Sequence, residues 1–445
     1  MSEKSDARVS PQAATYSSLI RIIMKKLNLN FFLLLLVLFV FSTSCKKETQ
    51  HPKPVSPVVT FGALLPISGP DAEGGKIAQA AVNVAINDLN NFMTYIGSST
   101  RYACVIEDSQ SDTNICLEKV KKLNGRGIKL LLGGPYNSRE LSAIKSYLDQ
   151  NQMLMLNVYS TSTKLSIAGD NIFRLAPDDT KQALGIVAML KYYGVRAFVP
   201  LFVNDLYGSG LMQKITSAFL AEGGIVSEGV SYSNATGDYT MVVNSLNEKV
   251  SAARQQYGGD KVAVVIVSST ETSAIFDIAR TFPDLTSVKW IGCDGNAGLN
   301  SLVDNRNAAS FAKMVKFLAP IFEVGHVWDG PYTPEYQQII DEVKSATGMV
   351  PNDNCLLNYD AVKIYALTSQ ALGDYSFDGF KKGLPLICAS YSNGNPTSGY
   401  KLNDAGDIAE PWFGFWAIIE TNGLYKWELT AHCIQDQIEF IVPSK

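Results

Sequence analysis

Short apolar runs and amphipathic helical patterns alternate along most of this chain, and this alternation constrains the fold more than any other feature. Val58–Leu65 is apolar almost throughout, as a strand buried on both faces should be. Apolar residues then recur at helical spacing over residues 82–93, before another strand-like run at 102–107. Strands that alternate with helices form parallel sheets covered on both faces. The pattern therefore predicts an α/β protein with Rossmann-like, doubly wound parallel sheets.

The alternation comes in two blocks, which predict two lobes. In the first block, further strands are expected at 128–132 and 153–158, and helices at 115–123 and 141–148. In the second block, strands are expected at 198–203, 225–232, 262–267 and 288–291, and helices at 211–219 and 275–279. Two later helices are expected at 336–346 and 357–372. The chain has 445 residues, which is too long for one typical core and suits two domains.

The amino-terminal segment is typical of an export signal. Lys25 and Lys26 precede an apolar run over residues 31–41, and three small residues then lead to Cys45. The run is shorter than the ~20 residues that a helix needs to cross a bilayer. A cleaved bacterial lipoprotein signal therefore fits better than the alternative, a transmembrane helix that ends near Cys45.

We therefore expect residues 1–44 to be a lead and signal peptide, Cys45 to carry lipid, and residues 45–57, which are polar and proline-rich, to be an extended tether. This would place the protein in the cell envelope, held to the membrane by its lipid and facing the periplasm. Ser42 departs from the leucine usual in such signals, and Met24 competes with Met1 as the true start.

Charge and composition exclude several classes of function. The formal net charge is −4, and no basic stripe exists that could follow a phosphate backbone, so nucleic acid is not an expected partner. The chain has three histidines, far apart, so neither a metal site nor a cofactor is expected. The motifs GxSxG and HExxH are absent, and no catalytic set emerges, so we do not expect an enzyme. Of the six cysteines after Cys45, only Cys104 and Cys116 are close enough in sequence to suggest a local disulfide.

Two glycine-rich turns follow strands in the first block. Residues 69–76 fall short of a phosphate-binding loop, because Ile77 replaces the required hydroxyl residue and Asp71 and Glu73 would repel a phosphate. Residues 133–138 (GGPYNS) end a strand and begin a helix. Ser138 can simply cap this helix, or its hydroxyl and the free N–H groups of the first turn can face a carboxylate.

Polar side chains also follow three other strands, at the sheet edge where ligands of open α/β sheets bind. One group is Tyr159-Ser160-Thr161-Ser162-Thr163, and another is the turn around Tyr207. Asp294 lies between two glycines just past a strand. It can serve only to stabilise its turn, or it can meet a ligand ammonium group.

Seven segments in order resemble a type 1 periplasmic solute-binding protein of the branched-chain amino-acid (Leu/Ile/Val) group. They are residues 61–73 (FGALLPISGPDAE), 107–112 (EDSQSD), 133–138, 207–210 (YGSG), 292–295 (GCDG), 359–362 (YDAV) and 399–407. The resemblance covers essentially all of the chain after the signal. It implies two lobes joined by crossover segments, with lobe 1 at 58–177 plus about 305–385 and lobe 2 at 178–304 plus about 386–445.

The resemblance also implies the roles of particular residues. Ser138 and Thr161 would bind the carboxylate of an amino acid, Asp294 its ammonium, and Tyr207 would close over it. Tyr159 and Ser160 belong to the same expected site. The family places a tryptophan over the ligand side chain where this chain has Gly74, so this aromatic lid is lost or is replaced by another residue such as Tyr136.

These observations lead to the hypothesis of a lipid-anchored protein that captures a small polar solute, an amino acid or relative, by hinge closure and presents it to an ABC-type importer. An alternative is a sensing or adaptor lipoprotein with the same fold. An extracytoplasmic enzyme on the same scaffold is a third, but no nucleophile or metal site supports it.

Overall fold

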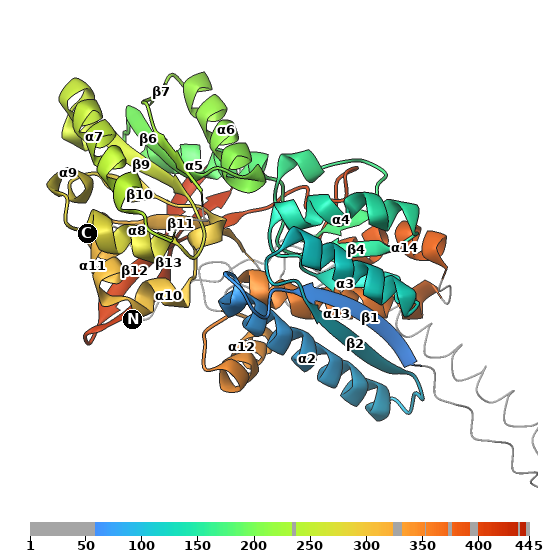
Figure 1. Cartoon of the computed structure of the whole chain (residues 1–445). Helices are drawn as coiled ribbons and strands as arrows, with labels where there is room; N and C mark the ends of the chain where they lie inside the picture. Colours follow the sequence, from blue (N-terminus) through green and yellow to red (C-terminus); the bar gives the residue numbers. More distant parts are fainter. Residues whose placement is uncertain are drawn as a thin grey trace, which may run out of the picture. The chain divides into compact units, whose positions relative to one another are not determined.

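The structure is a computed structural model that describes residues 58–233, 237–323, 332–351, 353–372, 376–391, 399–434 and 437–441. The expected signal peptide, the lipidation site Cys45 and the tether lie outside these residues. Residues 56–445 form one compact unit (Figure 1). Among the described residues, no helix combines the length and the apolar character needed to cross a bilayer.

Five of the described strands form an all-parallel sheet in the order β2-β1-β3-β4-β5. These strands are β1 (Val58–Leu65), β2 (Arg101–Asp108), β3 (Leu130–Gly133), β4 (Leu154–Asn157) and β5 (Ile172–Arg174). We call this sheet and the helices packed on it lobe 1.

The apolar runs of lobe 1 bury both faces of its sheet. Alternate side chains of a strand point to opposite faces, so Leu64 packs with α3 and α4 while Ala63 and Leu65 join the core under α2 and α13. The helices of this lobe are α2 (Ala72–Tyr95), α3 (Thr113–Gly125), α4 (Ser138–Gln150), α12 (Pro334–Thr347), α13 (Asp353–Leu372) and α14 (Phe377–Ser390).

The second sheet has the order β14-β13-β12-β11-β10-β9-β6-β7 among the described strands, and β8 also pairs with β6. Strands β6 to β11 pair in parallel, whereas β11 to β14 pair antiparallel. The strands are β6 (Ala197–Val203), β7 (Ile225–Val226), β8 (Val230–Tyr232), β9 (Val262–Val267), β10 (Lys289–Ile291), β11 (Leu318–Phe322), β12 (Phe413–Thr421), β13 (Leu424–Ile434) and β14 (Gln437–Phe440). We call this sheet and its helices lobe 2.

Helices cover both faces of the second sheet as well. Val265 and Val267 of β9 pack with α5 and α6 on one face, and Val264 and Ile266 pack with α7, α8 and α11 on the other. The helices are α5 (Asp179–Tyr192), α6 (Leu206–Ala221), α7 (Thr240–Tyr257), α8 (Thr272–Ala279), α9 (Pro283–Thr286), α10 (Asn300–Asp304) and α11 (Arg306–Met314). Short 3-10 turns lie at η1 (Thr163–Leu165), η2 (Gly259–Lys261) and η3 (Asp294–Asn296).

The doubly wound α/β architecture is confirmed, with three corrections in detail. The strand expected at 225–232 is two short strands, separated by residues 227–229. Gly229 lies close to the neighbouring strand, since a Cβ there would lie 2.4 Å from the Pro200 carbonyl oxygen. Residues 306–322, expected in lobe 1, form α11 and β11 of lobe 2. Conversely, α14 reaches Ser390 in lobe 1, beyond the expected boundary near 385.

The local disulfide expected between Cys104 and Cys116 is wrong. Both are free thiols, as are Cys293 and Cys388. Burial raises the pKa of the Cys104 thiol to about 12 and also raises that of Cys116, so both behave as apolar packing groups.

Candidate functional site

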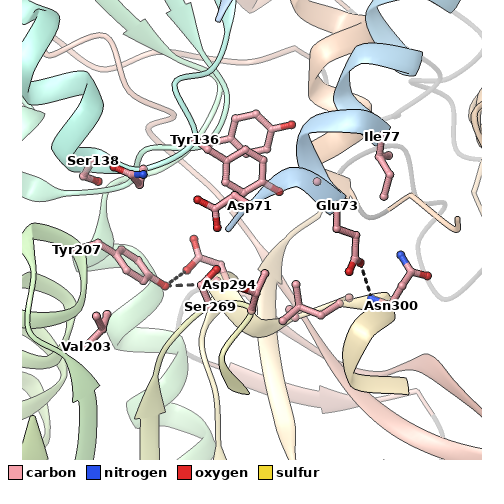
Figure 2. A pocket seen from close by; sticks show the side chains of 18 of the residues that line it. Asp71, Glu73, Ile77, Tyr136, Ser138, Val203, Tyr207, Ser269, Asp294 and Asn300 are labelled. Carbon is pink, nitrogen blue, oxygen red and sulfur yellow. Dashed lines mark hydrogen bonds between the residues drawn. The ribbon is translucent and has the colours of Figure 1, made fainter. Parts of the chain in front are cut away.

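A cavity of about 120 Å³ is lined by residues of both lobes (Figure 2). Lobe 1 contributes the segments after β1, β3 and β4, and lobe 2 those after β6, β9 and β10. The cavity therefore lies beyond the carboxyl ends of parallel strands, where α/β sheets bind ligands. Its lining includes Asp71, Glu73, Gly74, Ile77, Tyr136, Asn137, Ser138, Arg139, Tyr159, Val203, Asp205, Tyr207, Ser269, Thr270, Asp294, Gly295, Leu299 and Asn300.

Ser138 lies at the first turn of α4, but it does not cap the helix. Asn137 is the capping residue, and it forms a capping box with Glu140. The Ser138 hydroxyl is instead 2.8 Å from the Ser160 hydroxyl, and Ser138 lines the cavity. The capping role expected as one alternative for Ser138 is thus excluded, and Ser138 is the first residue of α4, the end at which the helix has unpaired N–H groups.

An aromatic pair forms one wall of the cavity. The rings of Tyr136 and Tyr159 stack with centroids 4.0 Å apart, and the Asn358 amide donates to the Tyr159 hydroxyl at 2.6 Å. A Cβ on Gly74 would lie 2.1 Å from the Tyr136 hydroxyl oxygen. The space next to Gly74 is therefore filled by Tyr136, so a larger residue at position 74 would collide with this ring.

Asp294 and Tyr207 meet in the part of the cavity formed by lobe 2. The Tyr207 hydroxyl, on α6, donates to Asp294 Oδ1 at 2.5 Å and accepts from the Gly295 amide at 3.3 Å (Figure 2). The Asp294 amide in turn donates to the buried Gln182 side chain at 3.1 Å. Burial raises the pKa of the Asp294 carboxyl, while the bond from Tyr207 opposes that rise. The arrangement presents a desolvated, oriented carboxylate to the cavity.

Ser160 and Thr161 lie behind the cavity surface, unlike Ser138 and Tyr159. Both are buried, and they are not among the residues that line the cavity. The Thr161 carbonyl accepts the Asp179 amide at 2.8 Å, and the Ser160 carbonyl accepts from Arg174 at 3.0 Å. Their backbone carbonyls thus form contacts behind the residues that line the cavity, and a direct contact of Thr161 with a ligand stays a prediction.

Sequence reasoning missed Asp179, a fully buried carboxylate next to the site. Burial, together with repulsion from Asp294, raises the pKa of its carboxyl to about 8, and the Thr161 hydroxyl partly opposes this rise. Its place at the start of a helix gave no signal in the sequence, because many helices begin with an aspartate.

Contacts that join the lobes across the cavity were also missed, among them a hydrogen bond from the Asn300 side-chain amide to the Val350 carbonyl at 3.1 Å. The Asn300 amide of α10 donates to the Glu73 carboxylate of α2 at 2.9 Å. The Arg139 guanidinium of α4 lies 3.6 Å from the Asp205 carboxylate, which also caps α6. Within the described ranges, no three His, Cys, Asp or Glu side chains are grouped so that they could hold a metal ion.

The fold and the cavity define the class of protein. Two α/β lobes that share a lined cavity form the type 1 periplasmic binding protein fold. The leucine binding protein LivK of Thermotoga maritima superposes with a TM-score of 0.65 at 17% identity, covering 85% of this chain and 99% of that protein.

The chain belongs to the family described as the receptor family ligand binding region, whose model matches residues 77–407. It is 25% identical over 379 residues to the uncharacterised protein MJ1266 of Methanocaldococcus jannaschii. This alignment covers 82% of this chain and 87% of that protein. It is also 23% identical over 190 residues to Glutamate receptor 2.3 of Arabidopsis thaliana. This alignment covers 42% of this chain and 20% of the receptor.

Proposed function

We propose that this protein captures a small solute with an amino group, an amino acid or a derivative, in the cavity between its lobes. The observation that carries the proposal is the pair formed by Asp294 and Tyr207, which presents a carboxylate to a cavity shared by both lobes. The cavity of about 120 Å³ is several times the volume of a water molecule, which takes about 30 Å³ in the liquid, so it has room for part of a small solute before any further opening of the lobes.

The remaining lining suits the other end of an amino acid. The helix α4 begins at the cavity with Ser138, and helix N-termini favour anions. Arg139, the next residue, adds a positive charge. We infer that the ligand carboxylate binds Ser138 and the first turn of α4, with Ser160 and Thr161 supporting this turn from behind. The Tyr136 and Tyr159 rings would contact the ligand side chain.

Capture would follow from hinge closure. Because each lobe supplies part of the lining, the ligand binds the closed form better than the open one and shifts the population toward it. We infer that the closed form presents its ligand to an ABC-type permease at the membrane. The family resemblance and the likeness to LivK support this role, as do the signal-like residues 1–44 that precede Cys45.

A sensing role is the second candidate, and the similarity to part of a plant glutamate receptor favours it. Both roles need the same ligand-bound closed state, so binding does not separate them. A transport defect for the ligand after gene deletion would support import. Normal uptake with a lost transcriptional or motility response to the ligand would support sensing.

Titration calorimetry of the purified full chain with the twenty amino acids tests the proposal. We expect at least one to bind, and we expect Asp294→Asn to weaken its binding at least about tenfold, since hydrogen bonds to charged groups contribute about 1.5–3 kcal/mol. Asp260→Asn, an exposed aspartate far from the cavity, is the matched control. Absence of heat with all twenty, or binding that Asp294→Asn leaves unchanged, would contradict the proposal.

A further inference from the structure

Carboxylates outnumber cationic groups around the cavity. Four acidic side chains line it, namely Asp71, Glu73, Asp205 and Asp294, whereas Arg139 is the one Lys or Arg among its described lining residues. A zwitterionic amino acid needs a single carboxylate for its single ammonium group. The excess of negative charge in this cavity therefore favours a solute that carries more than one positive group.

Three of these carboxylates have partners within the protein. Glu73 accepts the Asn300 amide, and Asp205 accepts the Gly208 amide and lies beside Arg139. Asp294 accepts from Tyr207 and is assigned above to the ligand ammonium. Asp71 also has a partner, the Ser111 hydroxyl, but this contact engages only one of its two carboxylate oxygens among the described residues.

Asp71 lies between β1 and α2, just before the first turn of the helix. The Ser111 hydroxyl donates to its Oδ2 at 2.8 Å, and no hydrogen bond from a described residue reaches Oδ1. Figure 2 shows its carboxylate next to Tyr136, on the side of the cavity that faces Tyr207 and Asp294. Burial is the main cause that raises the pKa of Asp71. The Ser111 hydrogen bond and the positive charge of Arg139 oppose this rise, and repulsion from Asp205 adds to it. A carboxylate so placed is stabilised by a positive charge that enters the cavity.

The neighbouring wall also suits a cation. Tyr136 and Tyr159 line the cavity as a stacked pair, and the faces of aromatic rings attract ammonium and guanidinium groups. A wall made of two tyrosines beside an aspartate differs from a lining suited to an aliphatic side chain.

We propose that the captured solute is an amino acid with a cationic side chain, whose second positive group binds Asp71 while its α-ammonium binds Asp294. This inference rests on the proposed function and names its substrate class. The two aspartates belong to different lobes, so a dicationic ligand contacts both and couples binding to closure.

Matched ligands test the charge directly. Arginine and citrulline have nearly the same shape, but citrulline carries a neutral ureido group in place of the guanidinium. In calorimetric titrations of the purified full chain, we expect arginine or lysine to bind at least about tenfold more tightly than citrulline, glutamine and leucine. Asp71→Asn should remove this advantage and leave citrulline binding within about twofold. Asp294→Asn should instead weaken arginine and citrulline alike, and Asp260→Asn should change neither.

The outcomes separate this inference from the proposed function. If leucine or citrulline binds as tightly as arginine and lysine, the charge inference is overturned but capture of an amino acid stands. The inference also fails if Asp71→Asn weakens all ligands equally, provided that its melting temperature matches the wild type. If no amino acid binds, both proposals fail.

Discussion

At the scale of single residues, the candidate site contains buried aspartates whose pKa values are raised, mainly by burial. Asp179 is fully buried beside Asp294, and the pKa of its carboxyl is about 8. In the unfolded chain an aspartate titrates near 3.9. The folded protein therefore binds this proton more tightly than the unfolded chain between about pH 4 and pH 8, and the free energy of unfolding falls through this group as pH rises across that window.

Replacing Asp179 with asparagine should remove this dependence. We expect Asp179→Asn to gain stability relative to the wild type from pH 5 to pH 8, by up to about 1.4 kcal/mol per pH unit. Glu140 has a pKa of about 7 and adds a slope of the same sign, but it is present in both proteins and cancels in the comparison. Urea denaturation at several pH values measures the difference. A difference that stays constant from pH 5 to pH 8 would show that Asp179 ionises normally.

The sequence could predict the place of a side chain where local chain geometry decides it, but the role of that side chain toward a ligand stays a prediction. Ser138, Tyr159, Tyr207 and Asp294 were expected from their place after strands, and all four line the cavity. Thr161 was expected at the surface of the site but lies behind it. The carbonyls of the segment after β4 accept hydrogen bonds from Arg174 and Asp179. These are tertiary contacts, which strand periodicity does not reveal.

At the scale of elements, α2 and the loop before α4 pack closely against each other at Gly74 and Tyr136. Tyr136 fills the position beside Gly74, where a Cβ would lie 2.1 Å from its hydroxyl oxygen. We expect Gly74→Ala to destabilise the protein by about 1–3 kcal/mol, as overpacking of a close-packed site does. In the Tyr136→Ala background the same change should cost much less. A double-mutant cycle from urea denaturation measures this coupling, and additive effects would contradict the account.

A second junction of elements depends on one buried carboxylate. Asp360 of α13 accepts hydrogen bonds from the hydroxyls of Tyr336 on α12, Tyr391 at the end of α14, and Tyr400. These contacts join three helices and the segment that leads back to lobe 2. The sequence showed the helix that holds Asp360 but not its three partners, because their separations of 24 to 40 residues fit no local pattern.

We expect Asp360→Leu to destabilise the protein by several kcal/mol, because three buried or partly buried tyrosine hydroxyls would lose their acceptor, and an unsatisfied buried polar group costs about 1–3 kcal/mol. Tyr400→Phe, which removes one donor, should cost clearly less. Urea denaturation of both variants gives the comparison. Equal losses would indicate that Asp360 acts through helix packing and not through the tyrosine cluster.

At the scale of the whole molecule, the alternation of strands and helices was enough to predict two doubly wound lobes, since parallel sheets need helices on both faces. It did not predict where the chain crosses between lobes. Residues 306–322 continue the helix-then-strand rhythm, which is the same in both lobes, and only the pairing of β11 with β10 and β12 assigns them to lobe 2. The sequence pattern also did not predict that β12 to β14 continue this sheet as antiparallel strands.

The contacts across the cavity predict how closure responds to mutation. Glu73→Ala removes the acceptor of the Asn300 amide, a bond that joins the two lobes. We expect ligand binding to weaken by about tenfold or less, because a net hydrogen bond contributes about 0.5–1.5 kcal/mol to the closed form. Small-angle X-ray scattering should show that ligand reduces the radius of gyration of both proteins, with more ligand needed for the variant. An unchanged radius in the wild type at saturation would argue against closure.

A crystal structure of the protein grown with the amino acid that binds most tightly in the calorimetric screen tests the central claim most directly. We expect the ligand to lie in the cavity between the lobes, with its α-ammonium within hydrogen-bond distance of the Asp294 carboxylate and its carboxylate at the start of α4. A ligand bound elsewhere on the surface, or one whose ammonium points away from Asp294, would contradict capture between the lobes by this site.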